Sequence, residues 1–253
     1  MIAVSMALLV LACTFAGALA GFVLRNVLPQ HHLDEETKDL IKLTMGLIAT
    51  MTALILGLVV TSAKEQFDAE DAYVKQSAAN VLALDRVLAR YGAETETIRA
   101  TIRRSLELRF NAIWPKSNAS AASLDSSDIE HAIEEVVDRT LALTPTNDKQ
   151  RWLQSQALQM SSSMQVNRWL MLEREEGVVG NPFLIALLCW LTVIFASWGL
   201  FAPRHATSFA ALGLSALSVA IAIFLILELE HPYRGLIRVS SAPIEFALAH
   251  LGT

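Results

Sequence analysis

A long stretch without helix breakers, apolar at its start and charged at its end, most constrains how this chain can fold. Leu43–Ala63 holds 21 residues without a charge, enough for a helix to cross about 30 Å of hydrocarbon. No glycine or proline lies between Gly57 and Gly92, so nothing stops the helix where it leaves the membrane. At ~1.5 Å per residue, a helix over Leu43–Tyr91 would be about 70 Å long. We predict one continuous helix that joins a membrane span to an aqueous region.

Small side chains recur on one side of this helix at steps of three and four residues. This small-residue stripe consists of Gly46, Thr50, Ala53, Gly57 and Thr61. Past the membrane the same side continues to charged residues, namely Lys64, Asp68, Asp71 and Lys75. A face that is small and hydroxylated in lipid and charged in water is typical of a helix that lines an ion path. Small residues also let membrane helices pack closely, so both interpretations stay open.

Composition places the chain among membrane proteins. Of its 253 residues, 53% are hydrophobic, and the mean hydropathy is +0.42, which is too apolar for an ordinary soluble domain. The formal net charge of −5 gives no indication of a nucleic-acid surface. Cys13 and Cys189 both lie in apolar runs, and two such residues form neither a redox motif nor a metal cluster.

Three further uncharged runs predict three more membrane spans. They are residues 1–24, 182–202 and 206–227. Ala18-Leu19-Ala20 in the first run resembles a signal-peptidase site, but the start carries no Lys or Arg and the run exceeds a normal signal sequence. We therefore expect a retained span, in which Cys13, Gly17 and Gly21 form a close helix contact.

Only Pro203, Arg204 and His205 separate the last two runs, which predicts a tight antiparallel hairpin. This puts Arg204 at the membrane surface, where contact with lipid phosphates is favoured over a role at an ion entrance. Glu228 ends the fourth span and is a second candidate for the membrane surface. It could line a cation path, although a single terminal carboxylate more often faces water.

The region between the second and third spans, residues 64–181, reads as a helical bundle. Apolar seams predict helices up to Tyr91, over residues 98–113 and through residues 153–171, the second one ending at Trp114-Pro115. Ser127 and Glu130 form a capping box that starts one more helix after a polar linker. Asp85 is the one charge near the first seam. We expect Asp85 to pair with Arg86, with Arg90 or with a basic residue of the next helix. Alternatively, its carboxylate extends to water at the edge of the apolar seam.

Two shorter segments complete the chain. The 18-residue connector Arg25–Lys42 contains the letters HHLDEE, which we interpret as an exposed loop with acidic residues at a helix start rather than as a metal site. The semi-apolar tail, residues 228–253, is interrupted by Gly235, Pro243 and charges. We expect it to lie at the interface or dock on the bundle rather than span the membrane.

The predicted fold class is therefore an all-α membrane protein with four transmembrane helices. Its parts are a hairpin (1–63, with spans 1–24 and 43–63), the bundle (64–181), a second hairpin (182–227) and the tail (228–253). Four spans put the N-terminus, bundle and tail on one side. That side carries six basic residues near the span ends and the other side four, which favours a cytoplasmic bundle in a protein of the cell inner membrane.

Five segments carry a resemblance to a known family. They are KLTMGLIATMTALILGLVVTSAKEQFDAE, QSAANVLALDRVLARYG, NRWLMLEREE, FASWGLFAPRHAT and LSVAIAIFLILELEHPYRGLIRVSSAP. The chain resembles the bestrophin-like domain family of bacterial integral membrane proteins over nearly its whole length, most densely from Trp152 to Pro243. That family is similar in layout to bestrophins, which are oligomeric anion channels whose second span lines the pore. No bestrophin pore motif carries over residue by residue, so the resemblance implies a channel through its layout alone.

No enzymatic activity and no cofactor are expected. The sequence lacks G-x-S-x-G, G-x-x-x-x-G-K, C-x-x-C and H-E-x-x-H. His131, Glu134 and Glu135 lie on one predicted amphipathic helix, whose water-facing side is expected to carry polar residues.

Three functions remain, with the lipid bilayer as a partner in each. The favoured one is an ion-conducting homo-oligomer, a pentamer by analogy or else a tetramer, with Lys64 and Asp68 at the cytoplasmic mouth. The resemblance favours selectivity for anions, whereas the acidic residues Asp68 and Asp71 favour cations. The alternative is a non-conducting scaffold or sensor whose bundle binds a partner. A small-solute transporter is least favoured, because internal repeats and mid-span helix breaks are missing.

Overall fold

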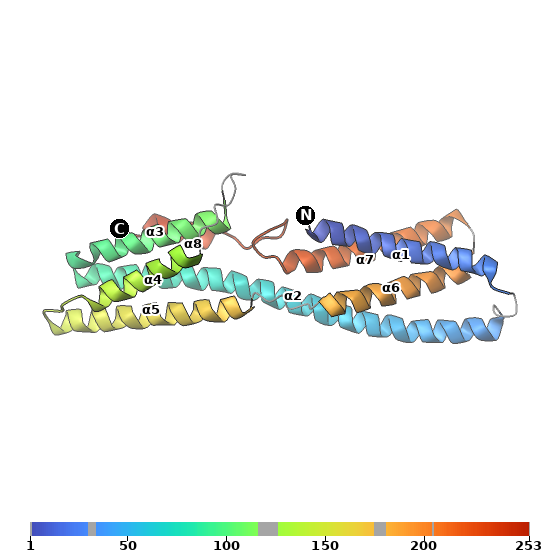
Figure 1. Ribbon diagram of the computed structural model, residues 1–253, viewed down its shortest axis with the longest axis horizontal. Helices are drawn as coiled ribbons and strands as arrows, with labels where there is room; N and C mark the ends of the chain where they lie inside the picture. Colours follow the sequence, from blue (N-terminus) through green and yellow to red (C-terminus); the bar gives the residue numbers. More distant parts are fainter. Residues whose placement is uncertain (1, 30–33, 116–125, 175–180, 204, 253) are drawn as a thin grey trace. The chain divides into compact units, whose positions relative to one another are not determined.

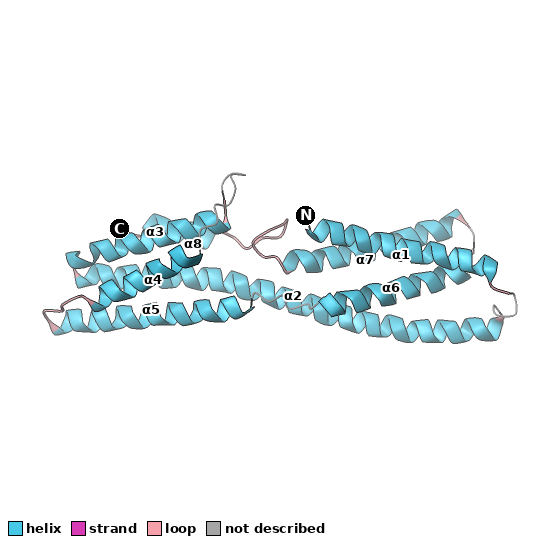
Figure 2. Cartoon of the chain, viewed as in Figure 1, coloured by secondary structure: helices cyan, strands magenta, loops and turns pink. Residues whose placement is uncertain are grey.

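The computed structural model describes residues 2–29, 34–115, 126–174, 181–203 and 205–252. All regular elements in these ranges are helices (Figure 2). Four of them are long and apolar enough to cross a membrane, namely α1 (Ile2–Val27), α2 (Glu35–Tyr91), α6 (Asn181–Phe201) and α7 (Ala206–Leu229). Over the described residues, an all-helical fold with four helices able to cross a membrane is confirmed.

Helix α2 is unbroken over 57 residues, which confirms the predicted continuation past Lys64. Its start differs from the prediction, because the connector becomes helical at Glu35 rather than after Lys42. The carboxylate of Asp34 accepts a hydrogen bond from the backbone N–H of Thr37 at 2.9 Å, and Glu35 and Glu36 fill the first turn. An N-cap and acidic residues favour a helix start, and the interpretation of the acidic residues of the connector as a helix start is confirmed.

The chain forms two compact units, residues 1–67 with 177–238 and residues 68–176 with 239–253. In the first unit, α1 packs against α6 and α7 (Figure 1). Glycine permits the close approach of α1 and α6, because a Cβ on Gly21 would overlap the backbone carbonyl of Ala196. One on Gly199 would overlap the carbonyl of Ala18, and one on Gly17 would lie 2.7 Å from the Thr192 oxygen. The close contact predicted at Gly17 and Gly21 is confirmed.

The second unit combines the last part of α2 with α3 (Glu96–Ile113), α4 (Ser126–Leu141), α5 (Asp148–Arg174) and α8 (Ala242–His250). Gly92 has a φ of 148°, a backbone conformation that favours glycine, and it ends α2 before the short 3₁₀ turn Ala93–Thr95. The buried core includes Leu84, Leu88, Ile102, Leu106, Leu153 and Ala157. Helix α3 ends at Ile113, before Trp114-Pro115, as the sequence predicts.

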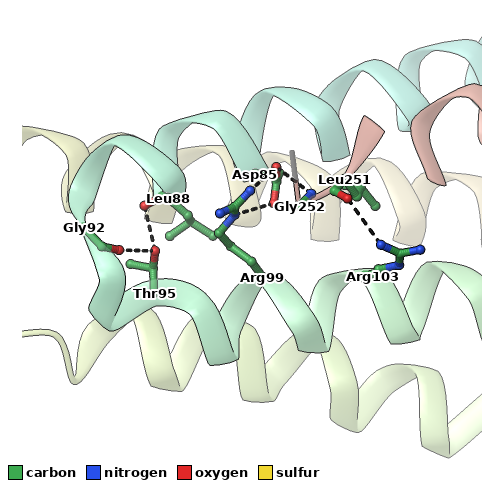
Figure 3. A network of polar contacts seen from close by, with 8 residues as sticks. All are labelled: Asp85, Leu88, Gly92, Thr95, Arg99, Arg103, Leu251 and Gly252. Carbon is green, nitrogen blue, oxygen red and sulfur yellow. Dashed lines mark hydrogen bonds and ion pairs between the residues drawn. The ribbon is translucent and has the colours of Figure 1, made fainter. Parts of the chain in front are cut away.

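Polar contacts join the end of the tail to α2 and α3 (Figure 3). Asp85 is 1% exposed and accepts two hydrogen bonds from Arg99, at 2.7 and 3.0 Å. The pairing raises the pKa of the Arg99 guanidinium above its ordinary value. Arg103 donates to the Leu251 carbonyl at 3.4 Å, and the Gly252 N–H points to Asp85. The partner of Asp85 is therefore on the second helix of the bundle, and the end of the tail is docked on that bundle.

Candidate functional site

The inward face of α2 belongs to the core of the first unit. Val59 and Ala63 are buried there with Val10 of α1, Leu187 of α6 and Ile226 of α7. Ile55 and Leu56 pack against the same cluster. This face fixes the rotation of α2 about its own axis, and it thereby decides what the remaining faces meet.

The small-residue stripe lies on another side of α2, and all five of its residues are exposed. A Cβ placed on Gly46 or on Gly57 would meet no atom within 4 Å. Gly21 and Gly199 behave in the opposite way, because their neighbours leave no room for a Cβ. Packing inside the protomer therefore explains the glycines of α1 and α6 but not those of α2.

Threonine hydroxyls on the stripe are hydrogen-bonded to their own helix. Thr50 donates to the Gly46 carbonyl and Thr61 to the Gly57 carbonyl, each at 2.9 Å. A hydroxyl that donates in this way keeps its oxygen lone pairs as acceptors. The stripe thus satisfies its polar groups without a neighbour and offers oxygen atoms to whatever lies beside it.

A second exposed face lies next to the stripe and is made of large aliphatic side chains. This leucine face consists of Leu43, Leu47, Leu54 and Leu58, which are between 63% and 75% exposed. Sequence reasoning did not separate it from the inward face, because both are apolar and hydropathy cannot distinguish lipid from protein as a neighbour. Large aliphatic side chains suit lipid tails, whereas the glycines and threonines of the stripe indicate a different neighbour.

In the charged continuation of the stripe, Lys64, Asp68 and Lys75 are exposed and Asp71 is half-buried. Lys64 lies over the ring of Phe67, 5.7 Å from its centroid, and Asp68 is exposed one turn later. Farther on, Lys75 and Asp71 form an ion pair at 2.6 Å. The helix thus brings all seven residues predicted to line an ion path onto one side.

Glu228 is buried within the protomer, which corrects the expectation that this carboxylate faces water. Glu228 is 5% exposed, and its carboxylate accepts hydrogen bonds from the backbone N–H groups of Leu236 and Ile237. Gly235, with a φ of 100°, passes so close that a Cβ there would overlap the carboxylate. The chain after α7 folds back over the helix end, so the Glu228 carboxylate holds a turn of the same protomer.

Other candidates lie partly outside the described residues. Arg204, His31 and His32 belong to segments that the structure does not describe, and so does the side chain of His131. Glu135 forms an ordinary ion pair with Arg139 at 2.6 Å. Among the described residues, no group of three or more His, Cys, Asp or Glu could hold a metal ion.

Comparison with known proteins identifies the family and nothing finer. The family model described as Bestrophin-like domain matches residues 12–244, which is most of the chain. No curated protein and no solved structure matches this chain.

Proposed function

The chain belongs to the bestrophin-like domain family, and we propose on that premise that it forms a homo-oligomeric ion channel of the bacterial inner membrane. The observation that carries the proposal is the small-residue stripe, which is exposed and has open space at Gly46 and Gly57. In a symmetric oligomer the stripes of several copies surround a common axis. Four spans from one copy are too few for a wide pore, so the path needs the oligomer.

Analogy with bestrophins favours a pentamer, with a tetramer as the other arrangement. The stripe residues line the path in the membrane, and small side chains leave room along the axis. The bundle faces the cytoplasm in this proposal, following the basic residues near the span ends. Lys64 and Asp68 then stand at the cytoplasmic mouth, where charges concentrate ions without being buried.

Anions are slightly favoured as the conducted species. The family analogy and Lys64 support this choice. Two observations oppose it, because Asp68 is acidic and the hydroxyls of Thr50 and Thr61 present acceptors rather than donors. Their hydroxyl protons must rotate away from the helix carbonyls before they can solvate an anion.

Reconstitution of the purified protein in planar bilayers, with ion substitution, tests the proposal. We expect single-channel currents, lowered conductance in Thr50→Val, and a shift of the reversal potential towards cations in Lys64→Glu. Thr44→Val is the matched control for the first variant, because Thr44 makes the same 2.9 Å bond to the carbonyl four residues before it and lies about 120° around the helix. Lys149→Glu is the matched control for Lys64→Glu, because Lys149 is an exposed residue of α5 and its substitution changes the net charge by the same amount.

Gly57→Leu is expected to block the current, since its Cβ projects into the open space beside the stripe. An oligomer that carries no current, or variants at Thr50 and Lys64 that conduct like the wild type, would refute the ion path.

A scaffold or sensor is the second candidate. Trp152 on α5 is 63% exposed, and an exposed tryptophan is typical of a protein-binding surface. A silent but intact oligomer, together with loss of a bound partner in Trp152→Ala, would favour this function.

A further inference from the structure

An apolar cavity of about 80 Å³ lies inside the second unit, and all four long helices of that unit contribute to its wall. Most of its lining is aliphatic: Val81 and Leu84 of α2, Ile102 and Leu106 of α3, Val136 of α4 and Met164 of α5. One water fills roughly 10–15 Å³ on this measure, so the space suits about five to eight non-hydrogen atoms. The cavity can therefore hold a small organic molecule.

A buried serine hydroxyl lines the same cavity without a partner. Ser161 of α5 is 3% exposed, and its oxygen has no hydrogen-bond partner among the described residues. Ser105, another lining residue, donates to the Thr101 carbonyl at 2.8 Å, as helical serines commonly do. An unpaired buried hydroxyl is unfavourable, and a ligand in the cavity would supply the missing acceptor.

Arg109 of α3 gives the cavity a positive charge. It is half-buried and contacts Tyr73, with the hydroxyl at 3.2 Å and the ring centroid at 5.6 Å. Arg99 and Arg103 on the same helix each pair with a carboxylate. No carboxylate among the described side chains forms an ion pair with Arg109, so most of its five N–H donors remain available for an anion.

We propose that this cavity is a binding site for short-chain aliphatic monocarboxylates. The charge of Arg109 selects a carboxylate, the Ser161 hydroxyl supplies a further donor, and the aliphatic wall takes a hydrocarbon tail of about two to five carbons beyond the carboxylate. A longer tail exceeds the volume, and a cation would meet the guanidinium. The site does not depend on the proposed ion path.

Calorimetric titration of the full-length protein in detergent with sodium hexanoate tests the site, with n-hexanol and hexylammonium as ligands of the same length. We expect saturable hexanoate binding at least tenfold tighter than hexanol binding, and none for hexylammonium. Arg109→Gln should weaken hexanoate binding tenfold or more, whereas Arg104→Gln, an exposed arginine of the same helix, should leave it unchanged. Ser161→Leu should fill the cavity and abolish binding.

Equal binding of hexanoate and hexanol would overturn the proposal, since the cavity would then be an apolar void without selectivity for charge. Absence of hexanoate binding would overturn it as well. These two results come from the wild type and do not require the variants to fold. Full hexanoate affinity in a folded Arg109→Gln would equally refute the assigned role of the guanidinium.

Discussion

Replacing Asp85 by alanine should loosen the second unit much more than replacing a surface carboxylate. Asp85 is 1% exposed, whereas the side chain of its partner Arg99 is 19% exposed. The change removes two charge-assisted hydrogen bonds, of 2.7 and 3.0 Å, and leaves the guanidinium without its counter-ion. It also removes the acceptor that faces the Gly252 N–H.

The expected loss is about 3 kcal/mol of local stability. Breaking one side of a buried ion pair typically costs ~3–5 kcal/mol, and the lower end applies because Arg99 retains some contact with water. At ~1.36 kcal/mol per tenfold change, this corresponds to amide exchange about 100-fold faster in α3 and α8. Glu107→Ala is the control, because the Glu107–Arg103 pair is about half exposed and such pairs contribute ~0.5 kcal/mol or less.

Hydrogen–deuterium exchange of the full-length protein in detergent micelles measures this effect segment by segment. The double variant Asp85→Leu with Arg99→Met should recover most of the protection, because apolar replacement of both partners removes the unpaired charge. Exchange in Asp85→Ala no faster than in Glu107→Ala would refute the reasoning that the buried pair fastens the tail.

Three further predictions rest on other contacts in the two units. Gly199→Ala should weaken the α1–α6 contact by ~1–3 kcal/mol, whereas Gly46→Ala should not lower the stability of the protomer, as thermal unfolding in detergent can show. Tyr91→Phe should stabilise the bundle by ~1 kcal/mol, because the buried Tyr91 hydroxyl has no hydrogen-bond partner among the described residues. Burial, followed by the Glu94 charge, raises the pKa of the Tyr91 hydroxyl. The wild type should therefore lose stability as the pH rises above 10, because the unfolded chain ionises first. An equal loss in Tyr91→Phe would show that Tyr91 is not the group responsible. Gly235→Ala should release the turn held by Glu228 and speed amide exchange at Leu236 and Ile237.

Sequence alone determined the four spans and the unbroken course of α2, because their causes are local. Uncharged runs of the right length predict spans, and the absence of glycine and proline between Gly57 and Gly92 predicts that α2 continues. Periodicity likewise put the seven candidate residues of α2 on one side of that helix. Even the close contact at Gly17 and Gly21 could be predicted, because the small-xxx-small spacing is a local signal of close helix packing.

Only the tertiary structure decided what each helix face meets. The stripe reads the same in sequence whether it packs on a neighbouring helix or faces open space, and the packing of Val59 and Ala63 into the core turned it outward. Asp85 had several basic residues within reach, and the fold of α3 against α2 selected Arg99. Glu228 became buried because residues 235–237 fold back over the end of α7. The cavity near Arg109 has no sequence signal, since its lining residues come from four helices and meet only when those helices pack together.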